Sequence, residues 1–316
     1  MKLQPRHAPA QIKKDDTAII MASNRLFQDT AFRFLPDASV GGIRYFVVYS
    51  HDGFWDVIPI DDLKTAIAYL PEKNKDWVIY TEGMGKLFTS AADRAMRMSA
   101  QYRVNVIMLD YPSIHAKWRR TRNYYFSKHY AGIAYKDFAP VIDTVKVLKA
   151  TNQLGTGSVN LFFHSMGNIV LEKMVLNNKI QFLNQSKWVD NLVLNAPCVR
   201  QRHHARWMNQ VNFAERIYVL YNPQDFTLGG AYFMSKWNQL GMKVKRPLAE
   251  KATYINFEKL AGKRHSNFLN LRGYPAQPEA AINIYSKLLH GEKVNVRDTV
   301  LYKISDYKKI GWDILP

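Results

Sequence analysis

The chain has 316 residues, of which 47% are hydrophobic and 22% are charged, which excludes a largely disordered protein. Lysine and arginine number 44 against 26 aspartates and glutamates, a formal net charge of +18. Such a charge favours anionic partners (acidic substrates, acidic lipid headgroups or nucleic acid), although a generally basic surface without a dedicated partner is an equal alternative.

Cysteine content and apolar runs bear on the compartment. Cys198 is the only cysteine, so no intramolecular disulfide can hold the fold. No apolar run approaches the ~20 residues that span a bilayer, and Met1–Lys14 lacks the apolar centre of a signal peptide. We therefore expect a cytoplasmic protein, with export as the alternative if a leader has been removed.

The first part of the chain predicts a basic N-terminal arm over residues 1–16, followed by a β-rich region. The expected elements are strands at Thr17–Ala22 and Tyr45–Ser50, turns at Asp37–Gly42 and His51–Gly53, and a short helix at Asp61–Tyr69. No linker follows this region. Residues 17–70 are therefore interpreted as an antiparallel extension of one domain that covers residues 17–316.

From Lys75 onwards, strand patterns alternate with helix patterns. The predicted strands are Trp77–Thr81, Val104–Leu109, Val159–Phe163, Leu192–Asn195, Ile217–Tyr221 and Ala252–Phe257. The predicted helices are Ser90–Tyr102, Tyr135–Leu154, Gly167–Phe182, Ala231–Leu240 and Pro278–Leu289. This order predicts an α/β fold with a mostly parallel central sheet and helices on both faces. In the C-terminal tail, residues 291–316, the run Thr299–Ile304 predicts pairing at a sheet edge.

The most informative segment leads from the strand at Val159 to the helix that begins at Gly167. Ser165 stands between the two. This order is that of a nucleophile elbow, in which a serine on a sharp turn projects its hydroxyl above the sheet. The Met166 N–H, at the helix N-terminus, would then stabilise an oxyanion. The alternative for an isolated Ser-x-Gly is a serine that caps the helix.

An acid and a histidine follow in the chain order that this kind of site requires. The strand Ile217–Tyr221 leads into Asp225, and the strand Ala252–Phe257 is followed by a loop that carries His265. His265 would take the proton from Ser165, while Asp225 would hold the imidazole in the right tautomer. A turn aspartate and a surface histidine are the alternatives for each residue alone.

The other histidines favour no additional chemistry. His164 adjoins the nucleophile, but adjacent strand residues point to opposite faces, so we expect it to hydrogen-bond locally. His203 and His204 lack a third ligand at a familiar spacing, so no metal site is predicted. The predicted reaction needs neither a metal nor an organic cofactor.

These motifs resemble a bacterial family of α/β-hydrolases of unknown function. Phe163-His-Ser-Met-Gly-Asn is similar to that family's Ala-His-Ser-Met-Gly-Asn elbow. The other similar segments are Thr17–Arg25, Asp110-Tyr-Pro-Ser, Asn195-Ala-Pro, Tyr221-Asn-Pro-Gln-Asp and His265-Ser-Asn-Phe. The resemblance covers most of the chain and implies an α/β-hydrolase fold.

Two positions depart from the usual pattern. Tyr80-Thr-Glu-Gly-Met-Gly-Lys falls where the family carries His-Gly and its second oxyanion donor, so the resemblance implies that the Met84 N–H is that donor. Glu82 replaces the histidine, and Phe163 stands where the common elbow has glycine. A catalytically weakened binding protein on the same fold is therefore the alternative to an active hydrolase.

Two basic clusters follow predicted strands. The first contains Lys117, Arg119, Arg120 and Arg122, interleaved with Trp118, Tyr124, Tyr125 and Phe126; the second contains Arg200, Arg202, His203, His204 and Arg206. Because both leave the carboxyl ends of strands, we expect them on the face that carries Ser165, with a solvated cover segment as the alternative.

The sequence thus predicts a serine hydrolase of the esterase or lipase kind, cleaving an ester, thioester or amide. The expected partner is a small-molecule or lipid-like ester, with a preference for anionic substrates. An acidic membrane surface is a second candidate partner, and no recognition motif supports binding to nucleic acid.

Overall fold

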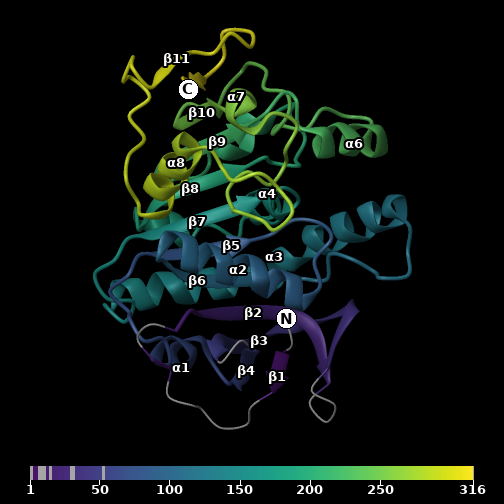
Figure 1. Ribbon diagram of the computed structural model, residues 1–316, viewed down its shortest axis with the longest axis vertical. Helices are drawn as coiled ribbons and strands as arrows, with labels where there is room; N and C mark the ends of the chain where they lie inside the picture. Colours follow the sequence, from purple (N-terminus) through teal and green to yellow (C-terminus); the bar gives the residue numbers. More distant parts are fainter. Residues whose placement is uncertain (1–2, 6–11, 14–15, 29–32, 52–53, 316) are drawn as a thin grey trace. The chain divides into compact units, whose positions relative to one another are not determined.

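Strands and helices alternate through most of the chain (Figure 1). A computed structural model describes residues 3–5, 12–13, 16–28, 33–51 and 54–315. The chain divides into an N-terminal unit, Met1–Ser158, and a C-terminal unit, Val159–Pro316. No helix in the described part of the chain combines the length and apolarity needed to span a membrane.

The N-terminal unit joins an antiparallel and a parallel set of strands. Its elements are β1 (Leu3–Pro5), β2 (Ala18–Gln28), β3 (Arg33–His51), β4 (Phe54–Ile60), α1 (Leu63–Ala68), β5 (Trp77–Thr81), α2 (Phe88–Tyr102), β6 (Asn105–Asp110) and α3 (Arg120–Ala150). The strand order within the unit is β1-β4-β3-β2-β6-β5. β2, β3 and β4 are antiparallel neighbours, whereas β6 is parallel to β2 and β5. The predicted antiparallel extension is therefore confirmed.

Several predicted boundaries in this unit are wrong. The turn expected at Asp37–Gly42 lies within the long strand β3, where the pairing with β2 shifts from Ser23 opposite Arg44 to Arg25 opposite Ser39. The turn-forming residues occupy this bulge, so the strand continues past them. The strand β4 was not expected. Helix α3 begins at Arg120, not at Tyr135, and contains Pro140.

Two predictions for this unit fall partly outside the described residues. Part of the expected arm, residues 3–5, forms β1, which pairs in parallel with β4. Residues 1–2, 6–11 and 14–15 of the arm lie outside the described part, as do residues 52–53 of the turn expected after β3.

A buried ion pair connects the carboxyl ends of β2 and β6. The Arg25 guanidinium donates to both oxygens of Asp110, from Nε at 2.7 Å and from Nη2 at 2.9 Å, and both side chains are almost fully buried. Arg25 Nη2 also donates to the Lys86 carbonyl at 2.9 Å. Ser113, three residues after Asp110, accepts from the Lys86 N–H at 3.0 Å. Arg25 in β2 and Ser113 after β6 therefore both hold the loop that follows β5.

We predict that Arg25→Met lowers the free energy of unfolding by about 3–5 kcal/mol, because it leaves the Asp110 carboxylate buried without its partner. Urea unfolding followed by tryptophan fluorescence measures the change. Arg97→Met is the control, since Arg97 pairs with Asp93 at the surface and such pairs contribute less than about 1 kcal/mol. Equal losses in the two variants would contradict the prediction.

The C-terminal unit is built on parallel strands. Its elements are β7 (Val159–His164), α4 (Gly167–Leu176), the 3₁₀ turn η2 (Leu183–Gln185), β8 (Val189–Asn195), α5 (His204–Met208), β9 (Ala214–Tyr221), α6 (Phe226–Ser235), β10 (Ala252–Asn256), α7 (Glu258–Ala261), α8 (Glu279–Leu289), β11 (Tyr302–Ile304) and β12 (Trp312–Ile314). The strand order within the unit is β7-β8-β9-β10-β12-β11. All neighbours are parallel except β11 and β12. The expected edge pairing of Thr299–Ile304 is confirmed by β11.

Two helices of this unit differ from their predicted bounds. Helix α4 ends at Leu176, not at Phe182, because the chain turns at Asn178, which has a left-handed φ of 55°. Helix α6 begins five residues before the expected Ala231. Asp225 caps it, accepting a hydrogen bond from the Leu228 N–H. The acid of the predicted triad thus also starts a helix.

Candidate active site

Ser165 occupies a strained turn between β7 and α4. Its φ is 52°, a left-handed conformation that is uncommon for residues other than glycine. The Ser165 N–H donates to the Asn195 carbonyl at 3.0 Å, and the Ser165 carbonyl accepts from the Cys198 N–H at 3.1 Å. The residue is only 7% exposed. Backbone strain of this kind persists only where the surroundings enforce it, and it is typical of functional sites.

The side chain of Asn168 holds this turn from inside the first turn of α4. Its amide nitrogen donates to the carbonyls of Phe163 at 2.9 Å and Ser165 at 3.0 Å, and lies 3.4 Å from that of Asn195. Asn168 is fully buried. One amide group therefore connects the end of β7, the serine itself and the end of β8.

We predict that Asn168→Ala destabilises the protein by about 1–3 kcal/mol, because it removes the buried amide that donates to the Phe163 and Ser165 carbonyls. Asn168→Asp should be at least as harmful, since a carboxylate cannot donate. Asn177→Ala is the matched control, because its amide donates to a single carbonyl on the exposed surface of the same helix. Urea unfolding gives the values. A control variant as unstable as Asn168→Ala would exclude this role.

Phe163 does not prevent the turn from forming. The residue is fully buried, and β7 stays paired with β8 through Phe163 opposite Leu194 and His164 opposite Asn195. Ser165 follows directly in the left-handed conformation. The departure from the glycine of the common pattern is therefore compatible with an intact elbow.

Asp225 and His265 form a hydrogen-bonded pair in the same unit. The imidazole Nδ1 lies 2.6 Å from Asp225 Oδ2, and Asp225 Oδ1 accepts from the Leu228 N–H at 2.9 Å. The Asp225 carboxylate is 1% exposed and the His265 side chain 13%. With Nδ1–H donating to the carboxylate, the neutral imidazole keeps Nε2 as an acceptor.

The loops that carry this pair are fastened to each other. The Asn222 side chain donates to the Gly262 carbonyl at 2.7 Å and to the Arg264 carbonyl at 3.3 Å. The Phe226 N–H donates to the Lys263 carbonyl at 3.3 Å. The loop after β9 therefore sets the position of the loop after α7, which carries His265.

His164 connects the elbow to the histidine loop. Its ring centroid lies 4.7 Å from that of His265. His164 Nδ1 lies 3.0 Å from the Asn195 amide nitrogen, and Nε2 lies 3.3 Å from the Ser266 hydroxyl. The expectation that His164 hydrogen-bonds locally is therefore wrong, because its partners lie 31 and 102 residues away in the sequence. The sequence patterns did not predict this network, although Asn195 lies within Asn195-Ala-Pro and Ser266 within His265-Ser-Asn-Phe.

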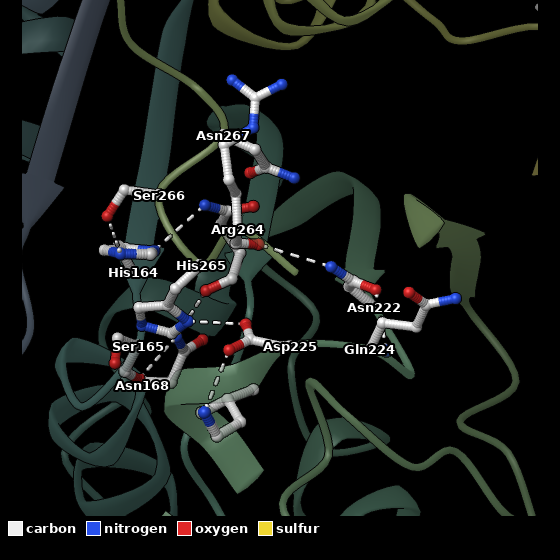
Figure 2. Close-up of polar contacts among 12 residues, drawn as sticks. His164, Ser165, Asn168, Asn222, Gln224, Asp225, Arg264, His265, Ser266 and Asn267 are labelled. Atoms are coloured by element: carbon white, nitrogen blue, oxygen red, sulfur yellow. Dashed lines mark hydrogen bonds and ion pairs between the residues drawn. The ribbon is translucent and has the colours of Figure 1, made fainter. Parts of the chain in front are cut away.

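The predicted triad residues lie in one cluster. Figure 2 shows the His265 imidazole between the Asp225 carboxylate and Ser165. Among the described residues, the Ser165 hydroxyl makes no hydrogen bond. A hydrogen bond between nucleophile and base that is long or absent without substrate, and that tightens in the reacting complex, is common in enzymes.

The loop after β5 in the N-terminal unit satisfies Glu82 locally. The Gly83 N–H donates to its carboxylate at 2.9 Å, the Tyr80 hydroxyl donates to the other oxygen, and Arg94 Nε lies 4.0 Å away. Burial and the Glu82 charge raise the pKa of Tyr80 well above its usual value. The N–H groups of Gly85 and Lys86 donate to Ser113. Within the described residues, the Met84 N–H has no acceptor, and its role as an oxyanion donor stays a prediction.

The two basic clusters belong to different units. In the first, Arg119 precedes α3, and the Arg122 guanidinium lies 3.7 Å from the Trp118 ring centroid; its role beside Ser165 stays a prediction. In the second, His204 is buried, which lowers its pKa, and both ring nitrogens are engaged, with the Gln201 carbonyl and the Tyr254 hydroxyl. The described part of the chain contains no group of three or more His, Cys, Asp or Glu residues that could hold a metal.

Parallel strands interleaved with helices, together with a serine on a left-handed strand–helix turn, define the α/β-hydrolase class. The chain belongs to the family described as alpha/beta hydrolase of unknown function (DUF900), whose model matches residues 61–289, more than half of the chain. The resemblance and the fold class expected from the sequence are thereby confirmed. No curated protein matches the chain.

Proposed function

We propose that the protein is a serine hydrolase that cleaves an ester, with a thioester or amide as alternative substrates, through an acyl-enzyme intermediate. Ser165 is the nucleophile, His265 the general base and Asp225 the residue that orients the imidazole. The observation that carries the proposal is the 2.6 Å contact between His265 and Asp225 in the unit that presents Ser165 in a left-handed turn.

In the proposed first step, Ser165 Oγ attacks the substrate carbonyl carbon while His265 Nε2 accepts the hydroxyl proton. The carbonyl oxygen becomes an oxyanion. The positive charge that forms on the imidazole is stabilised by Asp225, which stays ionised. His265 then gives the proton to the departing alkoxide, leaving the acyl group on Ser165. A water molecule, activated by the same base, reverses these steps and releases the acid.

Two backbone amides are the proposed oxyanion donors. The Met166 N–H belongs to the first turn of α4, where amide protons have no partner within the helix and the helix dipole favours negative charge. The Met84 N–H is the proposed second donor, supported by the absence of an acceptor among the described residues. Removing one such donor costs about 10²–10³ in turnover where it has been measured in other enzymes.

We predict that Ser165→Ala abolishes covalent labelling by a fluorophosphonate probe, because the probe reacts with an activated serine hydroxyl. In-gel fluorescence measures labelling, and circular dichroism checks the fold. Ser186→Ala is the control, since Ser186 is exposed and lies outside the triad. Labelling that persists in Ser165→Ala would rule out Ser165 as the nucleophile.

We predict that His265→Ala and Asp225→Asn each lower kcat for a model ester by about 10³–10⁴. Combining either change with Ser165→Ala should add little, because the triad acts as a unit. Steady-state kinetics on p-nitrophenyl esters of different acyl length provide the measurement. Turnover close to wild type in His265→Ala would exclude His265 as the base.

A non-catalytic binding protein on the same fold is the alternative. It predicts neither labelling nor turnover in the wild-type protein. The two departures that motivated this alternative do not favour it, because Glu82 is paired locally and Ser165 keeps its left-handed backbone with Phe163 in place.

A further inference from the structure

A cavity in the C-terminal unit concentrates positive charge. Its volume is about 540 Å³, and its basic lining residues are Arg200, Arg202, His203, Lys236, Lys245 and Arg246. The remaining lining residues are Gln201, Trp237, Asn238 and Pro247, so no carboxylate lines it. The volume lies within the range of small-molecule sites.

The charges in this cavity are not compensated by the protein. Among the described residues, no carboxylate forms an ion pair with Arg200, Arg202, Lys236, Lys245 or Arg246. Desolvation and the nearby Arg206, Arg202 and Arg200 charges lower the pKa of His203. Like charges gathered in this way repel each other, and a bound anion would relieve the repulsion.

The cavity wall is held by backbone hydrogen bonds. The segment after β8 pairs in antiparallel fashion with the segment after α6. The bonds run from the N–H groups of Gln201, Leu240 and Gly241 to the carbonyls of Asn238, Val199 and Pro197, respectively. Gly241 is required here, because a Cβ at this position would lie 2.4 Å from the Ala196 carbonyl carbon. The basic side chains therefore extend from a defined scaffold.

The same scaffold reaches the nucleophile turn. Cys198, within the paired segment, donates its N–H to the Ser165 carbonyl at 3.1 Å. Arg200 follows two residues later, at most ~7 Å along an extended chain. The cavity and the proposed nucleophile are thus connected by a short stretch of hydrogen-bonded backbone.

We propose that this cavity binds the phosphate group of a small molecule through Arg200, Arg202, Lys245 and Arg246. Arginine favours phosphate because its planar guanidinium donates two parallel hydrogen bonds to phosphate oxygens. The Arg200 guanidinium lies 5.7 Å from the Trp237 ring centroid, which places an aromatic face among the cations. Binding does not need the triad. The further step, that the ligand is the hydrolysed substrate, rests on the proposed function.

Isothermal titration calorimetry with inorganic pyrophosphate, at constant ionic strength set by NaCl, tests the proposal on the Ser165→Ala variant. We expect saturable binding, weakened about tenfold or more when Arg202, Lys245 and Arg246 are all changed to Gln, because charge-assisted hydrogen bonds are lost. The matched control changes Lys179, Lys293 and Arg297 to Gln, which removes the same charge from exposed positions outside the cavity. It should alter the affinity less than about twofold.

Four results would overturn the proposal. The first is the absence of saturable pyrophosphate binding. The second is an equal loss of affinity in the two triple variants, which would indicate diffuse surface charge. The third is binding of citrate as tight as that of pyrophosphate, which would indicate general anion binding. The fourth is tighter binding of a single-stranded oligonucleotide that the cavity triple variant loses, which would indicate a nucleic-acid site.

The hydrolase proposal can fail separately from this one. If the protein binds pyrophosphate but neither reacts with fluorophosphonate nor cleaves esters, the phosphate-binding proposal stands and the hydrolase proposal is wrong. If the protein cleaves neutral esters but does not bind pyrophosphate, the hydrolase proposal stands and the phosphate-binding proposal is wrong. If both hold, the cavity variant should lose kcat/KM for a phosphate-bearing ester and keep it for a neutral ester of similar size.

Discussion

The site depends on a serine backbone that is held in a left-handed conformation. Ser165 has a φ of 52° between a buried strand and a buried helix. A conformation of this kind costs on the order of 1–3 kcal/mol for a non-glycine residue. The Asn168 amide, the Asn195 carbonyl and the Cys198 N–H supply the contacts that maintain it. The free-energy cost of this strained turn is thus the cost of orienting the Ser165 hydroxyl.

The other proposed catalytic groups are placed by polar contacts between loops. Asp225 caps α6 and accepts from His265, so the same carboxylate starts a helix and orients an imidazole. Asn222 fastens the histidine loop, and His164 connects that loop to the elbow through Ser266. Each of these side chains is largely buried, so its hydrogen bonds are specific and costly to lose.

Charge is used in two different ways. In the N-terminal unit, the buried Arg25–Asp110 pair is matched in charge and tied to backbone carbonyls, which gives it a structural role. In the C-terminal unit, the cations of the cavity wall lie together without carboxylates. The net charge of +18 describes neither arrangement. Only the second leaves an unmatched field that favours an anionic ligand.

Local patterns in the sequence were enough to predict the class of fold and the elements near the site. The strand Trp77–Thr81 was predicted with its exact bounds, and the start of β7 at Val159 and that of α4 at Gly167 were also correct, because buried runs and helical periodicity are local signals. The order of Ser165, Asp225 and His265 was likewise visible, since each follows a strand.

The tertiary structure decided what local patterns do not encode. A bulge opposite β2 carried β3 through residues that form turns elsewhere, and a cap at Asp225 moved the start of α6. The pairing of His164 with Asn195 and Ser266 spans 31 and 102 residues of sequence. The lining of the basic cavity comes from residues 200–203, 236–238 and 245–247, so its lack of acidic residues depends on how these segments pack together. Contacts of this range depend on how strands pair and loops pack, which no single segment specifies.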